Sequence, residues 1–527
     1  GRHEVRDTLL RALVAVHGGD RPHIVTLRGA AGTGKSHLAR WLVTRAAEVG
    51  AAKGVWATHD PMLGSEDGVQ GLLARALGCT GMDWATACPR LGAQLGRALD
   101  DPTVRAVASI AYPDMQGRPA AHICGGVERL HTVATALYGL ADERPLVVWL
   151  DDAQWGLEAL ALAQHVQEAG VGRMLFVITL QTEALIEAPL AVERVDAIAG
   201  LSGSESCTLS RLPLPELRGL IRGLLQLGPS VAARIEERTA GNPLMVVQLI
   251  GDWIQRGVLV AGPHGFTLAP GADAHLPAGL DEVWSSRIAR WLSGRPEGWN
   301  VALEVAALLG TDVAEVEWER ACGLAGAGAP AGLPAALHEH GLARPHPNGW
   351  SFTHGMLREA VRGRAESSGR AVALHRACAG ALADLGGHRA AERIGQHFLR
   401  AGDLDAAVEP LLEAAIRRFD TGQPHMAGHL LAVREGALVE GGVPQGHQWW
   451  GDGWAAQSKV ELEMGDAQRS MALVMQLIDS SERHGWTEHD RKGLVSLSRM
   501  QFEAGEVQLA VENATKAPVM NTSGSSS

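Results

Sequence analysis

Apolar residues follow two different periods along the first part of the chain, and their order predicts strands alternating with helices. Short apolar runs have the length of buried strands, whereas other segments repeat their leucines at helical spacing. The predicted strands are residues 24–27, 55–57, 146–150 and 175–180. A long, mostly helical stretch from Gly68 to Leu140 is expected to break at Gly81, Pro113 and Pro119. This order indicates an α/β domain with a parallel sheet.

The pattern changes after the last of these strands. Residues 212–253 read as helices with a break at 241–243, and a hairpin is predicted at 257–268. Helices beginning at Asp281 and Asn300, followed by a two-strand wing around 345–349, predict a winged-helix module.

From residue 371 onward the chain is rich in alanine and leucine, and glycine turns open successive helices. A small residue follows each of four glycines by five positions, which allows paired helices to approach closely. The pairs are Gly402 with Ala407, Gly422 with Ala427, Gly465 with Ser470, and Gly505 with Ala510. We predict an irregular tetratricopeptide-like solenoid; the alternative is a non-repeating helical bundle.

Composition narrows the class of protein. The 527 residues predict several domains, and no apolar run reaches the ~20 residues of a membrane span. A net charge of −12 argues against broad nucleic-acid binding. Six scattered cysteines suggest neither a zinc site nor a disulfide framework, so we expect a soluble, cytoplasmic protein. The chain starts at Gly1 without methionine and ends in a serine-rich tail expected to be disordered, which indicates a fragment.

The stretch Gly29–Ser36, GAAGTGKS, carries the most specific chemical signal. It fits G-x-x-x-x-G-K-[ST] and stands between a predicted strand and a predicted helix, as a phosphate-binding P-loop requires. Glycines let backbone N–H groups close around phosphate oxygens. Lys35 is expected to neutralise the β and γ phosphates, and the Ser36 hydroxyl to be a Mg²⁺ ligand. The alternative, a chance glycine turn, does not account for the flanking strand and helix. The predicted nucleotide-binding loop residues are Gly29, Gly32, Thr33, Gly34, Lys35, Ser36 and His37.

Two carboxylates follow the third predicted strand. At the carboxyl edge of a parallel sheet they lie where ligands bind. Asp151 is the candidate for holding Mg²⁺, and Asp152 for orienting or deprotonating the attacking water. Together with Lys35 they are the predicted catalytic residues. Gln181, Thr182 and Glu183 end the next strand, and either face a γ-phosphate or form a solvated strand end.

With these motifs, the chain resembles the STAND class of signalling ATPases, in the branch of large bacterial LuxR-type ATP-binding regulators. The resemblance rests on Gly1–Glu4 before the P-loop, on the D-D-x-Q-W stretch from Asp151 to Trp155, on Gly241–Leu244, and on Phe352–His354 with Arg358–Ala360. Relatives commonly carry an Arg at the position of Gln181 and an Ala-Asp pair at Gly156 and Leu157.

The resemblance implies a nucleotide, ATP or ADP with Mg²⁺, clamped between a P-loop domain, a helical lid and a winged helix. Arg2 and Pro243 are then expected to border the nucleotide, and His354 to report on its phosphates. Without the resemblance, His354 reads as a hydrogen-bonded structural histidine. The repeats from 371 onward also resemble regions that follow bacterial Ser/Thr kinase domains.

The predicted architecture is therefore multidomain: an α/β P-loop NTPase domain followed by a helical lid, a winged helix and an α-solenoid. The predicted boundaries are 1–190, 191–276, 277–368 and 369–517, with a tail at 518–527.

We expect an ATP/ADP-dependent signal-transduction switch and slow ATPase. Its repeats would sense an unknown protein or small-molecule input and it would form a homo-oligomer on activation. Nucleic acid would be contacted only through an effector module outside these residues. The alternatives are a nucleotide-stabilised repeat scaffold, favoured by Gln181, and a motor ATPase acting on nucleic acid, disfavoured by the negative charge and the lack of an identifiable arginine finger.

Overall fold

The computed structural model describes residues 1–19, 21–61, 68–82, 84–112, 126–141, 144–262, 264–269, 271, 279–386 and 390–516. Two compact units divide the chain. The first comprises Gly1–Ala121 and Leu130–Leu374, and the second comprises His122–Arg129 and His375–Ser527. The predicted breaks at Pro113 and Pro119 and the predicted disordered tail lie outside the described residues.

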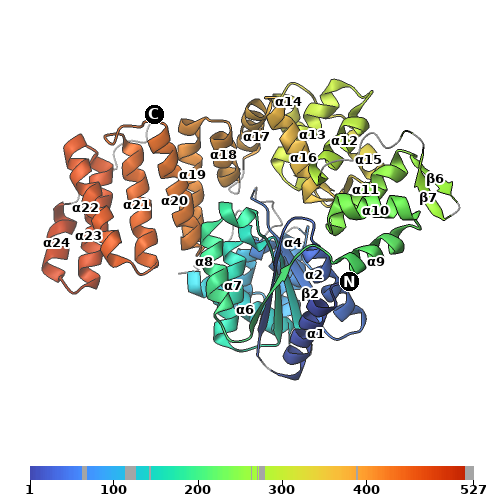
Figure 1. Cartoon of the computed structure of the whole chain (residues 1–527). Coiled ribbons are helices and arrows are strands. Elements are labelled where there is room, and N and C mark those ends of the chain that lie inside the picture. The colour runs from blue at the N-terminus through green and yellow to red at the C-terminus, as the bar shows by residue number, and fades with distance from the viewer. Residues whose placement is uncertain are drawn as a thin grey trace. The chain divides into compact units, whose positions relative to one another are not determined.

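A five-stranded parallel sheet forms the centre of the N-terminal part of the first unit, with strand order β2-β3-β4-β1-β5 (Figure 1). Its strands are β1 (His23–Gly29), β2 (Lys53–Thr58), β3 (Leu146–Asp151), β4 (Met174–Gln181) and β5 (Ser204–Leu209). The three central strands are buried almost throughout because helices cover both faces of the sheet. Leu9, Val25, Leu42 and Val177 belong to one apolar core that joins the sheet to α1 and α2. The predicted α/β P-loop domain is confirmed.

Helices connect and flank these strands. They are α1 (His3–Gly18), α2 (Lys35–Glu48), α3 (Gly68–Ala76), α4 (Trp84–Leu95), α5 (Pro102–Ala111), α6 (Gly126–Leu140), α7 (Leu157–Ala169) and α8 (Pro189–Ala199), with short 3₁₀ turns at Ala153–Trp155 and Ala184–Glu187. The long excursion between β2 and β3 is helical where it is described, as predicted.

Three helices follow β5 and pack around an apolar cluster that includes Leu217, Ile235 and Trp253. They are α9 (Leu214–Leu224), α10 (Pro229–Thr239) and α11 (Pro243–Gln255), and we call them the lid helices. The side chain of Asn242 caps α11 by accepting a hydrogen bond from the N–H of Met245, and Pro243 occupies the first helical turn, where no N–H partner is needed. The predicted hairpin follows as β6 (Leu259–Gly262) and β7 (Gly265–Leu268).

The remaining part of the first unit contains helices and a three-stranded antiparallel sheet, β8-β10-β9. Its elements are α12 (Leu280–Leu292), α13 (Glu297–Leu309), β8 (Asp312–Ala314), α14 (Glu315–Leu324), α15 (Leu333–Glu339), β9 (Ala343–His346), β10 (Gly349–Phe352) and α16 (Gly355–Ser367). The β9–β10 hairpin turns at the predicted place, and Trp350 packs edge-on against both Trp318 and Phe352. These are the elements of a winged helix, and we call them the winged-helix module.

Successive antiparallel helices make up most of the second unit (Figure 1). They are α17 (Ala371–Leu385), α18 (Ala390–Arg400), α19 (Leu404–Asp420), α20 (Pro424–Glu440), α21 (Gln448–Glu463), α22 (Ala467–His484), α23 (Thr487–Glu503) and α24 (Val507–Lys516). Ala407, Ala427, Ser470 and Ala510, the small residues noted in the sequence, are all buried. The expected helical repeats are therefore present.

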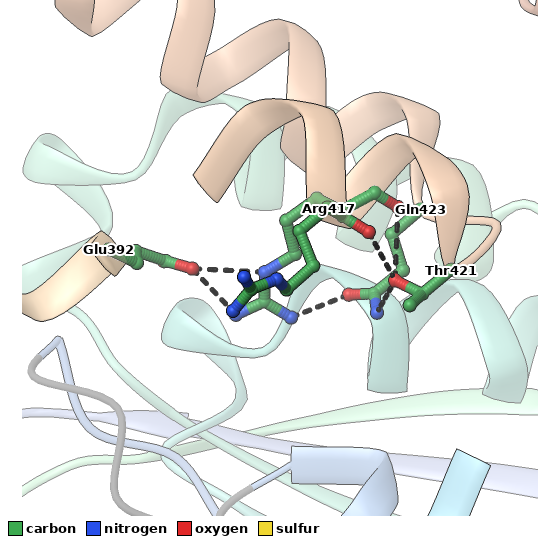
Figure 2. Close-up of polar contacts among 5 residues, drawn as sticks. Glu392, Arg417, Thr421 and Gln423 are labelled. Atoms are coloured by element: carbon green, nitrogen blue, oxygen red, sulfur yellow. Dashed lines mark hydrogen bonds and ion pairs between the residues drawn. The ribbon is translucent and has the colours of Figure 1, made fainter. Parts of the chain in front are cut away.

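Polar contacts fix the turns between these helices, as Figure 2 shows for the end of α19. The Arg418 guanidinium donates to Glu392 of α18 at 2.8 and 2.9 Å and to Gln423, before α20, at 2.7 Å. The Thr421 hydroxyl donates to the Arg417 carbonyl at 2.9 Å and accepts from Gln423 (Figure 2). One guanidinium thus ties together three successive helices, because its fork donates in several directions.

Candidate nucleotide-binding site

The loop between β1 and α2 has the backbone geometry that a P-loop requires. Gly32 and Gly34 have φ of 76° and 98°, a region that favours glycine. The Thr33 hydroxyl donates to the Ala30 carbonyl at 2.8 Å and closes the turn. Lys35 and Ser36 lie in the first turn of α2, whose N-terminal N–H groups form a ready anion site. His37 is exposed.

Lys35 is a buried cation within this loop. Its Nζ donates to the carbonyls of Gly29 and Ala30, both at 2.9 Å, so its hydrogen-bond partners are neutral. Burial lowers the pKa of Lys35, while the charges of Asp152, Glu183 and Asp151 act in the opposite direction. A buried ammonium whose hydrogen bonds go to carbonyls fits an anionic phosphate, which would supply the missing charge.

Ser36 and Asp151 are brought together from positions 115 residues apart. The Ser36 hydroxyl donates to Asp151 Oδ1 at 2.7 Å, which places two hard oxygen donors side by side. Mg²⁺ commonly takes one or two protein oxygens and completes its shell with phosphate and water. Among the described residues, no group of three or more His, Cys, Asp or Glu side chains is arranged to hold a metal. The pair therefore fits Mg²⁺ that arrives with a nucleotide.

Asp152 stands beside this pair in a strained conformation. Its φ is 49°, in the left-handed region that non-glycine residues seldom adopt. Burial, followed by the negative charge of Asp151, raises the pKa of Asp152 to about 7, against the opposing effect of Lys35. A carboxyl group with a pKa near neutrality can exchange a proton at physiological pH.

Thr179, in the buried strand β4, organises both carboxylates and was missed by the sequence analysis. Its hydroxyl donates to Asp151 Oδ1 at 2.6 Å and accepts from the N–H of Asp152 at 3.0 Å. The available signal was a single polar residue inside the apolar run LFVITL. Gln181 ends the same strand, and its backbone N–H donates to Gln154 Oε1 at 3.2 Å.

The lid helices contact the P-loop directly. Asn242 Nδ2 donates to the carbonyl of Ala31 at 3.1 Å, and the N–H of Leu244 donates to the carbonyl of Gly32 at 3.3 Å. Pro243 lies between these two contacts. A Cβ at Gly32 would lie 2.8 Å from Asn242 Oδ1, so this close approach requires glycine. Asn242 was named in the sequence only as part of a family motif, without a role of its own.

Arg2 also reaches the loop. Its Nη2 donates to the carbonyl of Thr33 at 3.4 Å and to that of Ser210, while its backbone N–H is held by the Glu216 carboxylate of α9. Burial lowers the pKa of Arg2, and Glu216 opposes this. Its φ of 63° adds a second strained residue at the site. Arg2 thus joins the P-loop to the start of the lid.

His354 lies apart from these contacts. Its ring packs against Trp284 at 5.8 Å between centroids, and no described residue links its imidazole to the P-loop by a hydrogen bond. Desolvation by neighbouring atoms and the charges of Arg287, Arg40 and Arg344 lower its pKa, although solvent screens these charges because the side chain is exposed. Arg40 belongs to α2, so His354 lies within electrostatic reach of the P-loop helix.

A parallel sheet with a P-loop after its first strand, and two carboxylates at the end of the buried strand β3, which β4 separates from β1, defines a P-loop NTPase. Residues 1–177 match the AAA ATPase domain family. The N-terminal third of the chain is therefore an AAA-type P-loop ATPase domain, a class that binds nucleotide, and the sequence prediction is confirmed to this extent.

Two solved structures resemble larger parts of the chain more distantly. One is a Signal Transduction ATPase with Numerous Domains (STAND) protein with a tetratricopeptide repeat sensor from Pyrococcus horikoshii, at 12% identity and a TM-score of 0.35, covering 96% of this chain and 76% of that chain. The other is Cdc6p from Pyrobaculum aerophilum, at 14% identity and a TM-score of 0.29, covering 70% and 95% respectively. No curated protein matches the sequence. Among the described residues, no helix is long and apolar enough to cross a membrane.

Proposed function

We propose that this protein is an ATP/ADP-dependent switch of the STAND type, in which the nucleotide held by the P-loop determines how the lid and the winged-helix module pack. One observation carries the proposal: Asn242 and Leu244 of the lid hydrogen-bond to the backbone of the P-loop itself. Any change in the loop that accompanies phosphate binding therefore acts on α11.

Each residue of the site has a role in this proposal. Lys35 and the loop N–H groups bind the phosphates, and Arg2 and Pro243 border the nucleotide. Ser36 and Asp151 hold Mg²⁺, which neutralises the phosphate charge when bound. Asp152 orients or deprotonates the attacking water, and Thr179 fixes the position of both carboxylates.

The switch requires that nucleotide and input bind the two states with different affinity, because a ligand with equal affinity for both shifts nothing. We propose that the helical repeats bind the input, and that exchange of ADP for ATP then releases an oligomerising form or an attached effector. Slow hydrolysis resets the protein.

Nucleotide binding is tested by titrating ATP and ADP, with and without Mg²⁺, into wild type and Lys35→Ala. Loss of the buried ammonium should weaken binding by about 100-fold or more, since charge-assisted hydrogen bonds to phosphate are lost. Lys53→Ala is the matched control, because Lys53 begins β2 and donates to the carbonyl of Leu140. Wild-type affinity in Lys35→Ala would remove Lys35 from the site.

The switch itself is tested by measuring the size of the protein with ADP, and with ATP plus cell extract. We expect a monomer with ADP and a larger species under the activating condition. A monomer of constant size that carries no nucleotide under any condition would contradict the proposal.

Gln181, which stands where relatives commonly carry an Arg, supports a second candidate function. This candidate is a repeat scaffold whose nucleotide is structural and is never hydrolysed. The two functions differ in steady-state phosphate release by wild type and Asp152→Asn. A rate that falls in the variant supports the switch with its hydrolytic reset, whereas equal rates indicate that Asp152 takes no part in turnover.

A further inference from the structure

A buried ion pair joins the AAA ATPase domain to the winged-helix module. Arg358 Nη1, in the first turn of α16, donates to Asp60 Oδ2 at 2.5 Å, and the side chains are only 4% and 10% exposed. The Thr311 hydroxyl, just after α13, donates to the same Oδ2 at 2.8 Å. Neither Asp60 nor Thr311 drew attention in the sequence, because they lie 251 residues apart along the chain.

The winged-helix module holds the arginine ready for this contact. Arg358 Nε donates to the carbonyl of Ala307, in α13, at 2.8 Å, which fixes the plane of the guanidinium. A guanidinium held in this way loses little further freedom when it binds a carboxylate. The ATPase domain therefore contributes only the acceptor, Asp60, and the winged-helix module contributes a guanidinium that is already held in position.

His59, the residue before Asp60, is attached to the acidic turn of the candidate site. Its Nδ1 lies 2.8 Å from the carbonyl of Asp151, and since a carbonyl only accepts, Nδ1 carries the proton. The ring packs against Gly156, where an added Cβ would lie 2.2 Å from His59 Cδ2. This contact gives a physical reason for the glycine at position 156, where the sequence departs from the pattern it resembles.

Consecutive residues thus contact the acidic turn and the winged-helix module. The strand register explains this, because Thr58 at the end of β2 pairs with Asp151 at the end of β3. A displacement of the Asp151–Gly156 turn would therefore move His59, which packs against it. Asp60 would move as well, because it is the next residue along the chain.

An ion pair suits a contact that must open and close. Burying two charges costs solvation free energy, and both charges regain that solvation when the surfaces separate. The ion pair therefore orients the contact while adding only modest net stability. Removing one partner while the contact stays closed is costly, because it leaves the other charge buried.

We propose that Asp60, Arg358 and Thr311 form a clasp between the ATPase domain and the winged-helix module, and that His59 couples this clasp to the acidic turn. The coupling part rests on the proposed nucleotide switch, whereas the clasp itself does not. Residues His59 and Asp60 are positioning residues with no contact to nucleotide in this proposal.

The clasp is tested by hydrogen–deuterium exchange on the full chain freed of nucleotide. Asp60→Asn and Arg358→Gln should each raise exchange at residues 305–313 and 355–361 by about tenfold or more, and the double variant should exceed neither single variant by more than twofold. Thr311→Val, which removes one neutral donor, should have a smaller effect in the same segments. Arg362→Gln is the matched control, since Arg362 lies one turn along α16 and its ion pairs with Glu359 and Glu366 stay within that helix.

Exchange equal to that of Arg362→Gln in both Asp60→Asn and Arg358→Gln would overturn the clasp. If Arg358→Gln does not fold, Asp60→Asn and Thr311→Val still decide the question. This experiment contains no nucleotide, so its failure is distinct from failure of the proposed function.

The coupling is tested by release of a fluorescent ADP analogue. His59→Asn and Gly156→Ala, which lie outside the clasp, should accelerate release at least threefold and raise exchange at residues 355–361. Release and exchange unchanged from wild type in both variants would overturn the role of His59 while leaving the clasp intact. A wild type that binds no analogue would count against the proposed function instead.

Discussion

At the residue scale, single polar groups determine how the two carboxylates of the candidate site are held. The Thr179 hydroxyl bonds Asp151 on one side and the N–H of Asp152 on the other, inside a strand that is otherwise apolar. Without Thr179 the Asp152 N–H would lose its hydrogen-bond partner, whereas Asp151 Oδ1 would keep the bond from Ser36.

Thr179→Val should therefore destabilise the protein by about 1–3 kcal/mol, since it keeps the shape of the side chain and leaves the Asp152 N–H unsatisfied. Chemical denaturation of the first unit measures the loss, and Mg²⁺-dependent ATP binding should weaken in parallel. Thr26→Val, in the neighbouring strand β1, is the control, because no described residue hydrogen-bonds the Thr26 hydroxyl. Equal effects of the two substitutions would show that the Thr179 bonds contribute nothing.

His59 should make the stability of the folded protein depend on pH. Burial lowers the pKa of His59 below the value of about 6.5 that it has when unfolded. Between that value and the lowered pKa the unfolded chain binds a proton that the folded chain does not, so stability falls as pH decreases below about 6.5. We expect His59→Asn to lose less stability than wild type between pH 7 and pH 5 in parallel urea titrations; identical losses would contradict this assignment.

At the scale of elements, the P-loop packs closely against the start of α11. Gly32 and Gly34 both have positive φ, yet only a Cβ at Gly32 would meet the lid, whereas nothing lies within 4 Å of a Cβ at Gly34. Backbone strain is therefore common to both positions, and contact with the lid is specific to one.

Gly32→Ala should separate α11 from the loop, and Gly34→Ala should not. Both substitutions cost about 1 kcal/mol in backbone strain. Hydrogen exchange of residues 242–246 in nucleotide-free protein should rise only in Gly32→Ala. A rise of equal size in both variants would mean that strain in the loop, rather than the contact with Asn242 and Leu244, controls the lid.

At the scale of the whole molecule, the two units have separate apolar cores. The candidate nucleotide-binding residues lie in the first unit, whereas the second unit contains buried polar contacts such as those of Arg434. This guanidinium donates to the carbonyls of Val408 at 3.1 Å and Trp449 at 2.8 Å, and burial lowers its pKa to about 10.

Thermal unfolding should accordingly contain two transitions that respond to different changes. Mg²⁺-ATP at 100 times its Kd should stabilise only the transition of the first unit, by about 2.7 kcal/mol. Arg434→Met should lower only the other transition, because it removes the hydrogen bonds from the guanidinium to the carbonyls of Val408 and Trp449. Calorimetry of wild type and variant, with and without ATP, measures both; one transition that moves as a whole under either change would contradict the independence of the units.

Much of the fold could be predicted from local patterns. The central strands, the hairpin at β6–β7, the wing at β9–β10 and the repeat helices were all expected, because each carries a strong period or a turn signal. Strand β5 was not predicted. It is an edge strand with the sequence SESCTL, in which exposed residues alternate with partly buried ones, so it lacks the apolar run that identified the others.

The sequence by itself determined the P-loop and the two carboxylates near it, because phosphate binding depends on a short contiguous motif and Asp151 and Asp152 end an unmistakably apolar strand. Only the tertiary structure decided which distant polar groups complete the site. Thr179, the Asn242 contact, and the clasp of Asp60 with Arg358 each depend on strand register or domain packing, and a pairing across 298 residues leaves no mark in local sequence.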